Sequence, residues 1–175
     1  MYTIVERFLE ERNIEIVRRV NFDSQTRYDG SYLGAWPPEA ETMIGIKRLD
    51  DIEYCITDVL KRPVPGDFLE AGVWRGGAAI FMRAILKAYN VTDRVVWATD
   101  SFRGLPSPQV GRYRDDAGDN WVDLNDVFGV SLEQVKSNFA RYELLDDQVR
   151  FLAGWFHDTL PTAPIKRLPG TTTGL

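Results

Sequence analysis

Phe68-Leu69-Glu70-Ala71-Gly72-Val73-Trp74-Arg75-Gly76-Gly77 is the stretch of this 175-residue chain that decides its fold. An apolar run ends there in an acidic residue and glycines, just where a helical pattern begins. In α/β domains such a turn forms a site for a nucleotide-like ligand, because glycines let the backbone approach it and the new helix directs unpaired N–H groups at it. A tight turn without a ligand is the alternative that the stretch alone leaves open.

The spacing of the glycines separates this turn from the dinucleotide-binding fingerprint. The chain reads Glu-x-Gly-x-x-x-Gly from Glu70 to Gly76, whereas the fingerprint reads Gly-x-Gly-x-x-Gly. The second early glycine is absent, which counts against a dehydrogenase.

The flanking sequence predicts alternating helices and strands. Apolar residues recur at helical spacing, and short apolar runs bounded by turn residues read as buried strands. Ser131 is expected to cap a helix, with Gln134 completing a capping box. The expected strands cover Asp67–Val73, Arg94–Ser101 and Val149–Trp155, and the expected helices cover Thr42–Lys61, Gly76–Tyr89 and the residues after Ser131. This alternation implies an α/β fold with a mostly parallel, doubly wound sheet and right-handed crossovers.

Four segments lie outside this alternation. Tyr2–Arg19 fits one or two amphipathic helices, and Asn21–Ala40 reads as an aromatic loop suited to covering a site. Arg103–Val130 is too polar and too broken for a regular element, so we expect a mobile surface loop or lid. After Pro161 the pattern stops, and Lys166–Leu175 shows neither a helical nor a strand period.

Composition limits the class of protein. A net charge of −5 without a basic block argues against a nucleic-acid binder and leaves small molecules or other proteins as expected partners. The single cysteine, Cys55, excludes an intrachain disulfide and is expected to be a buried thiol without a function. Met1–Glu10 lacks the basic start and apolar core of a signal peptide, and no run is long enough to span a membrane. We therefore expect a cytoplasmic protein.

Ligands of doubly wound sheets lie at the carboxyl ends of the strands, so residues there are the first candidates. Asp100 is placed to accept hydrogen bonds from ribose hydroxyls, or alternatively to cap a turn. Trp155 offers an aromatic face to a purine or packs in the core. His157 is a candidate general base, although the lack of a partner fixed by spacing favours a surface or capping role.

An acidic cluster lies in the expected lid. Its members are Asp115, Asp116, Asp119 and Asp123. Their spacing does not match the calcium-binding loop of an EF-hand, which favours a solvated surface over a cation site.

Four blocks of sequence become recognisable when they are taken in order. They are Glu41-Thr42-Met43-Ile44-Gly45 with Arg48-Leu49-Asp50, Phe68–Gly77, Asp100-Ser101-Phe102-Arg103-Gly104-Leu105-Pro106, and Gly154-Trp155-Phe156-His157-Asp158-Thr159-Leu160-Pro161. Together they resemble the macrocin O-methyltransferase (TylF/MycF-like) family over roughly residues 28–165. The resemblance implies the N-terminal part of a Rossmann-like class I methyltransferase sheet with an N-terminal helical appendage.

The resemblance also implies methyl transfer from S-adenosylmethionine to a sugar hydroxyl of a natural product such as a macrolide, with Mg²⁺ as a second cofactor. Thr42 and Met43 correspond to contacts with the methionine end of S-adenosylmethionine, and Glu70–Trp74 to the loop beneath it. Asp100 corresponds to the ribose ligand, and Trp155 to a neighbour of adenine. The implied cofactor-binding positions are Thr42, Met43, Glu70, Ala71, Gly72, Val73, Trp74, Thr99, Asp100, Ser101, Phe102, Arg103 and Trp155.

The metal-binding carboxylates of the family have no counterpart after the third expected strand. An Asp-Gly-Asp-like motif and a later Asp-Asp pair are missing, and Lys166–Leu175 stands where a fourth strand should begin. The sequence therefore reads as an incomplete copy with unknown catalytic residues; a non-catalytic cofactor-binding or partner-modulating fragment is the alternative. We expect N-terminal helices and an aromatic cover loop over residues 1–41, a partial methyltransferase domain over 42–165 and an atypical tail over 166–175.

A sheet of three strands would leave an unpaired edge and exposed apolar surface. We therefore expect low stability or association with a partner, and a homo-oligomer is one form of such association. The other expected partner is a sugar-bearing small molecule, the methyl acceptor.

Overall fold

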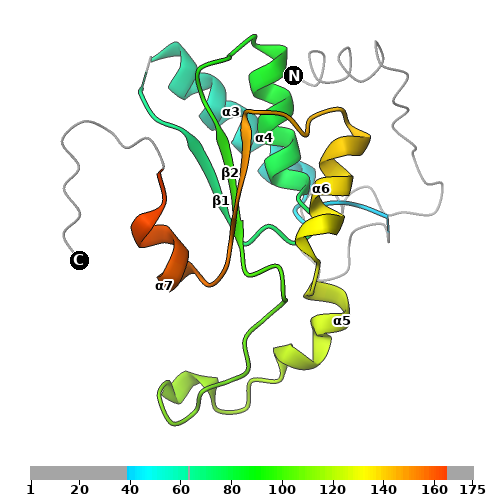
Figure 1. Ribbon diagram of the computed structural model, residues 1–175, viewed down its shortest axis with the longest axis vertical. Coiled ribbons are helices and arrows are strands. Elements are labelled where there is room, and N and C mark those ends of the chain that lie inside the picture. The colour runs from blue at the N-terminus through cyan, green and yellow to red at the C-terminus, as the bar shows by residue number, and fades with distance from the viewer. Residues whose placement is uncertain (1–38, 63, 165–175) are drawn as a thin grey trace.

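A three-stranded parallel sheet forms the centre of the part of the chain that the structure describes (Figure 1). The computed structural model describes residues 39–62 and 64–164. The strands, in their spatial order, are β1 (Phe68–Ala71), β2 (Val96–Asp100) and β3 (Val149–Ala153). Phe68 pairs with Val96, and Val96 pairs with Val149, so all three strands end at the same edge of the sheet. The predicted parallel α/β arrangement is confirmed.

Several predictions lie outside the described residues. They concern the helices at Tyr2–Arg19, nearly all of the aromatic loop at Asn21–Ala40 and the tail at Lys166–Leu175. Within the part of the chain that the structure describes, no helix is long and apolar enough to cross a membrane.

The larger helices share one face of the sheet. They are α3 (Ile46–Lys61), α4 (Gly77–Ala88) and α6 (Leu132–Arg141). Figure 1 shows α4 and α6 on one side of the sheet, with the short helix α7 (Phe156–Thr159) on the other. Both crossovers step in the same direction, from β1 to β2 to β3, and right-handed crossovers then place both helices on one face. The described residues therefore show the part of the predicted doubly wound fold in which successive crossover helices cover one face of the sheet.

The core fills the space between the sheet and these helices. Val96 and Ala98 of β2 and Ile85 of α4 are fully buried there. Phe139 of α6 packs edge-to-face on Phe151 of β3, with 5.6 Å between the ring centroids. Full burial of an aliphatic or aromatic side chain contributes roughly 1.5–3 kcal/mol, so this cluster holds the helices on the sheet.

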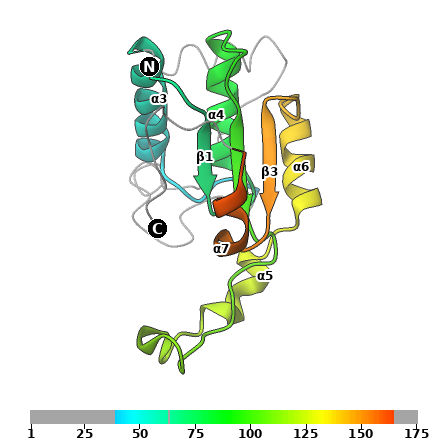
Figure 2. The same ribbon diagram turned by 60° about the vertical axis from the view of Figure 1, so that its left-hand side comes forward.

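A projecting segment, Arg103–Val130, extends beyond the carboxyl ends of the strands (Figure 2). The prediction that it lacks regular structure is wrong, because it contains the helical turns Arg114–Asp116 (η1), Trp121–Leu124 (η2) and Asn125–Phe128 (α5). The Asn125 side chain closes its base by accepting from Leu105 N–H (2.8 Å) and donating to Leu105 O (3.1 Å). Trp74 Nε1 donates to Val127 O at 2.8 Å. Such single contacts leave no periodic pattern in the sequence.

The N-terminus of α6 forms half of the predicted capping box. Gln134 N–H donates to Ser131 Oγ at 3.2 Å, as expected for the cap. The Gln134 side chain instead donates to Asn138 Oδ1 at 2.9 Å, so it does not reach back to Ser131.

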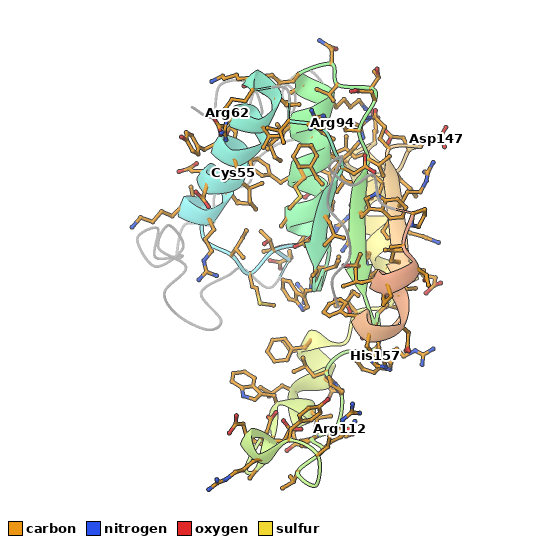
Figure 3. The ribbon with its side chains drawn as sticks, turned by 90° about the vertical axis from the view of Figure 1, so that its left-hand side faces the viewer. Cys55, Arg62, Arg94, Arg112, Asp147 and His157 are labelled. Atoms are coloured by element: carbon orange, nitrogen blue, oxygen red, sulfur yellow. The ribbon has the colours of Figure 1, made fainter. Side chains whose placement is uncertain are left out.

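Cys55 is exposed, which corrects the expectation of a buried thiol (Figure 3). Its neighbours Ile52 and Ile56 face the core from α3. A residue one position before Ile56 is turned by about 100° around a helix of 3.6 residues per turn, which takes its side chain away from the core.

Arg83 is a buried cation on α4. Its Nε donates to Asp146 Oδ1 at 3.0 Å and its Nη2 to Asp146 Oδ2 at 2.7 Å, while Nη1 has no hydrogen-bond partner among the described residues. Partial burial acts to raise the pKa of Asp146, but hydrogen bonds from Arg83 and from Gln148 N–H lower it overall.

We expect Asp146→Asn to lower the free energy of unfolding by about 2–3 kcal/mol, because Arg83 would stay buried without a counter-charge and Asp146 is itself partly exposed. Urea denaturation at neutral pH measures the change. Asp147→Asn removes the same charge from the adjacent residue and should change stability by less than about 0.5 kcal/mol. Equal losses in the two variants would contradict the role of the Arg83 pair.

Candidate functional site

The backbone turns sharply where the three strands end. Residues with positive φ follow every strand: Gly72 (85°) and Trp74 (49°), Phe102 (54°) and Gly104 (83°), and Gly154 (147°). Positive φ is costly for residues with a side chain such as Trp74 and Phe102, and strain of this kind concentrates at functional sites. The carboxyl edge of the sheet is therefore the place to look for a site.

A pocket of about 720 Å³ opens at this edge, between the strand ends and the projecting segment. Small-molecule sites have volumes of roughly 300–1,000 Å³, so it can take a cofactor-sized ligand. A Cβ built on Gly72 would meet no atom within 4 Å, so a ligand can approach the backbone there. The predicted site residues that line the pocket are Met43, Gly72, Trp74, Asp100, Ser101 and Trp155.

Asp100 is fixed at the end of β2 by backbone N–H groups. Its Oδ2 accepts from Val73 N–H at 2.7 Å, and its Oδ1 accepts from Phe102 N–H at 2.9 Å. The Ser101 hydroxyl also donates to Oδ1, at 3.3 Å. A carboxylate has about four lone-pair positions, so these three bonds leave room on Oδ2 for a ligand hydroxyl. The sequence offered turn capping and ribose binding as alternatives for Asp100. The Asp100 carboxylate caps the turn and still has room on Oδ2 to accept from a ribose hydroxyl.

Glu70 does not line the pocket and instead caps α4. Its Oε2 accepts from Ala79 N–H at 2.9 Å. Burial raises the pKa of Glu70 to about 8; the bond from Ala79 opposes this rise, and the charge of Asp100 adds to it. Gly77 N–H donates to Glu41 O at 2.8 Å. Two of the first three N–H groups of α4 are thus used within the protein, and the prediction that they point unpaired at a ligand is wrong for these two.

Other predicted positions shape the turns behind the pocket. Thr99 is fully buried, and its hydroxyl donates to Glu70 O at 2.6 Å, which links β2 to β1. Phe102 belongs to the core, with its ring centroid 6.4 Å from that of Phe151. Their ligand contacts stay predictions. The predicted positions that do not line the pocket are Thr42, Glu70, Ala71, Val73, Thr99, Phe102 and Arg103.

Trp155 faces the pocket from the start of α7 rather than packing in the core. It also lines an adjoining pocket of about 590 Å³ together with Arg112 and His157. Figure 3 shows His157 near the base of the projecting segment that carries Arg112. His157 is exposed, with its Nε2 3.2 Å from Asp158 Oδ1, which fits a surface role.

The outer wall of the pocket was missed by sequence reasoning. It comes from the projecting segment and includes Leu105, Pro106, Pro108, Asp116, Asp119, Trp121 and Phe128. The rings of Trp121 and Phe128 lie 6.1 Å apart. Aromatic residues in an otherwise polar loop were the signal that could have identified this wall, since a solvated lid has no need of them.

The acidic cluster stabilises turns of the projecting segment. Asp116 Oδ2 accepts from Gln109 N–H at 2.7 Å, and Asp119 Oδ1 accepts from Trp121 N–H at 2.9 Å. Across residues 39–62 and 64–164, no group of three or more His, Cys, Asp or Glu side chains is arranged to hold a metal ion.

The sequence matches the family model described as Macrocin-O-methyltransferase (TylF) over residues 1–169. The chain belongs to the macrocin O-methyltransferase family. The solved structure of the O-methyltransferase NovP is similar, with a TM-score of 0.79 and 47% sequence identity over 93% of this chain and 66% of that one. The resemblance seen in the four sequence blocks is confirmed, and the fold is part of a Rossmann-like methyltransferase fold.

Two curated relatives of this TylF-family chain come from Streptomyces. An 8-demethyl-8-(2,3-dimethoxy-alpha-L-rhamnosyl)-tetracenomycin-C 4'-O-methyltransferase of Streptomyces olivaceus is 52% identical over 84% of this chain and 57% of the relative. A demethyldecarbamoylnovobiocin O-methyltransferase of Streptomyces niveus is 57% identical over 76% of this chain and 51% of the relative. The chain therefore spans about half the length of the curated relatives it matches.

The raised pKa of Glu70 predicts a stability that declines with pH. The carboxyl ionises near its ordinary pKa of 4.5 in the unfolded chain but keeps its proton up to about pH 8 in the folded protein. The folded state thus binds more protons in this window, and the free energy of unfolding falls as pH rises through it. Glu70→Gln keeps an acceptor for Ala79 N–H but cannot titrate, so its free energy of unfolding should lack this decline. Between about pH 5 and pH 8 the difference in free energy of unfolding, variant minus parent, should rise by up to about 4 kcal/mol.

Urea denaturation of both proteins across this pH range measures the difference. Parallel pH dependence in the parent and in Glu70→Gln would contradict the raised pKa.

Proposed function

We propose that residues 42–165 form the S-adenosylmethionine-binding part of an O-methyltransferase that acts on a sugar hydroxyl of a natural product. The observation that supports this best is the convergence of Met43, Gly72, Asp100 and Trp155 on one pocket at the strand ends. In this assignment Asp100 accepts the ribose hydroxyls and Trp155 lies against adenine. Membership of the TylF family favours the same methyl donor.

The N-terminus of α4 favours a cofactor without phosphate groups. A dinucleotide rests its pyrophosphate on helix N–H groups at this kind of turn. Here the N–H groups of Gly77 and Ala79 already donate to Glu41 and Glu70. A phosphate would have to displace these acceptors and approach two carboxyls, Glu70 and Asp100. S-adenosylmethionine carries no phosphate, and the positive charges of its amino and sulfonium groups are attracted to the Asp100 carboxylate in the pocket wall.

The outer half of the pocket is suited to a sugar-bearing acceptor. Trp121, Phe128 and Phe156 offer faces on which a sugar ring can pack, and Asp116 and Asp119 offer oxygens that accept from hydroxyls. The name of the Streptomyces olivaceus relative includes a rhamnosyl group, which supports an acceptor of this class. A small sugar-bearing molecule is therefore the partner that we propose.

Methyl transfer needs the acceptor hydroxyl aligned with the methyl group and relieved of its proton. The resemblance to the family implies Mg²⁺, which when bound would lower the pKa of the hydroxyl. The described residues of this chain offer no group of three ligands for such an ion. The proposal thus assigns these residues to donor binding and acceptor positioning, and assigns none of them to the metal or to proton removal. It also implies a cytoplasmic location, where the methyl donor is made.

Isothermal titration calorimetry with S-adenosylhomocysteine tests the donor site. We expect the parent to bind, and Asp100→Ala to bind at least about 10-fold more weakly because hydrogen bonds to a charged group are lost. Asp115→Ala removes a carboxylate of the projecting segment that does not line the pocket, so it should bind like the parent. NAD⁺ should not compete.

Circular dichroism checks that both variants are folded. Absence of binding by the folded parent, or equal affinity in Asp100→Ala, would contradict the proposed site.

A further inference from the structure

The strap, residues Ala40–Met43, brings Met43 to the pocket wall without being part of a helix or strand. It crosses the first turn of α4 at close range. A Cβ built on Gly77 would lie 2.6 Å from the backbone carbonyl of Glu41 and 2.6 Å from Thr42 Cβ. Only glycine leaves space for this crossing, in which Gly77 N–H donates to Glu41 O at 2.8 Å.

The side chain of Glu41 ties the strap to the C-terminal end of α6. Its carboxylate pairs with Arg141 and accepts a hydrogen bond from the Tyr142 hydroxyl at 2.6 Å. Glu41 is largely buried, with its side chain 13% exposed. Burial and the contact with Glu41 raise the pKa of Tyr142 well above its usual range. Neither Glu41 nor its two partners line the pocket, so none of the three is placed to contact a ligand there.

A second set of hydrogen bonds joins α6 to the turn after β1 and to the start of the strap. Arg75 Nη1 donates to Ala40 O at 3.1 Å. Asn138 of α6 is buried and holds Arg75 in place by donating from Nδ2 to Arg75 O at 2.8 Å. The Arg75 guanidinium in turn lies 4.4 Å from the ring centroid of Trp74, a pocket residue. Helix α6 thus supports both the strap and the turn after β1.

We propose that Glu41 is a positioning residue for the amino-acid end of the cofactor. It acts through the strap, because its carboxylate fixes Thr42 and Met43 beside the pocket while making no ligand contact of its own. The inference rests on the proposed function, in which the strap meets the methionine end of S-adenosylmethionine. The adenosine end lies over Asp100 and Trp155, so loosening the strap weakens only those ligands that carry the amino-acid group.

Two ligands separate this role from general stability. S-adenosylhomocysteine has the amino-acid group, whereas 5'-methylthioadenosine retains only the nucleoside and the sulfur. We expect Glu41→Ala to raise the Kd for S-adenosylhomocysteine about 10-fold, and Tyr142→Phe to raise it about 3-fold, because each removes part of one charge-assisted hydrogen-bond network. The Kd for 5'-methylthioadenosine should change less than about 2-fold in both variants.

Asp146→Asn is the control, since it destabilises the protein at the Arg83 pair without touching the strap, and it should bind both ligands like the parent. Equal weakening of both ligands by Glu41→Ala, or no weakening, would overturn the positioning role while leaving the proposed function in place. Failure of the parent to bind S-adenosylhomocysteine would overturn the proposed function and this inference with it. If Glu41→Ala does not fold, Tyr142→Phe decides by the same comparison, because it keeps the ring and loses only the hydroxyl.

Discussion

The hydrogen bond from Ala79 N–H to the Glu70 carboxyl fixes the first turn of α4 against the end of β1, and the arrangement of the pocket depends on it. Together with the bond from Gly77 N–H to the strap, it occupies the helix terminus that α/β proteins commonly offer to a phosphate. A ligand must therefore lie to the side of the helix, over the open backbone of Gly72 and towards Asp100. The turn resembles a dinucleotide site in outline, but two N–H groups that a phosphate would use already donate within the protein.

Packing holds two strained turns in place at the carboxyl ends of β1 and β2. Trp74 and Phe102 adopt positive φ where strands end, at a cost of about 1–3 kcal/mol each. Packing offsets this cost, because Phe102 is buried in the core and Trp74 is held by the Arg75 guanidinium and by its bond to Val127 O. The rigid core thus holds residues at the pocket edge in conformations that they would not adopt alone.

Much of the fold was predictable because it follows local periodicity. The parallel sheet and α4 lie close to their predicted ranges, and Asp100 and Trp155 were placed at the pocket from their positions after strands. Helix α3 begins at Ile46 rather than Thr42, since the strap is held by the distant Gly77. No periodic pattern reports a contact between segments so far apart in the chain.

Two of the remaining errors have the same origin, and the error at Cys55 does not. The turns of the projecting segment depend on single bonds such as those of Asn125, which no apolar pattern announces. Gln134 matched a capping box but found a better partner in Asn138 one helical turn along. The exposure of Cys55 could have been predicted, because the spacing of Ile52 and Ile56 shows which face of α3 meets the core.

A crystal structure of the chain with S-adenosylhomocysteine would show whether the strand ends form a methyl-donor site. We expect ribose hydroxyls within hydrogen-bond distance of the Asp100 carboxylate, adenine beside Trp155 and the amino-acid end beside Met43. The ligand bound with its ribose away from Asp100, or bound outside this pocket, would contradict this expectation.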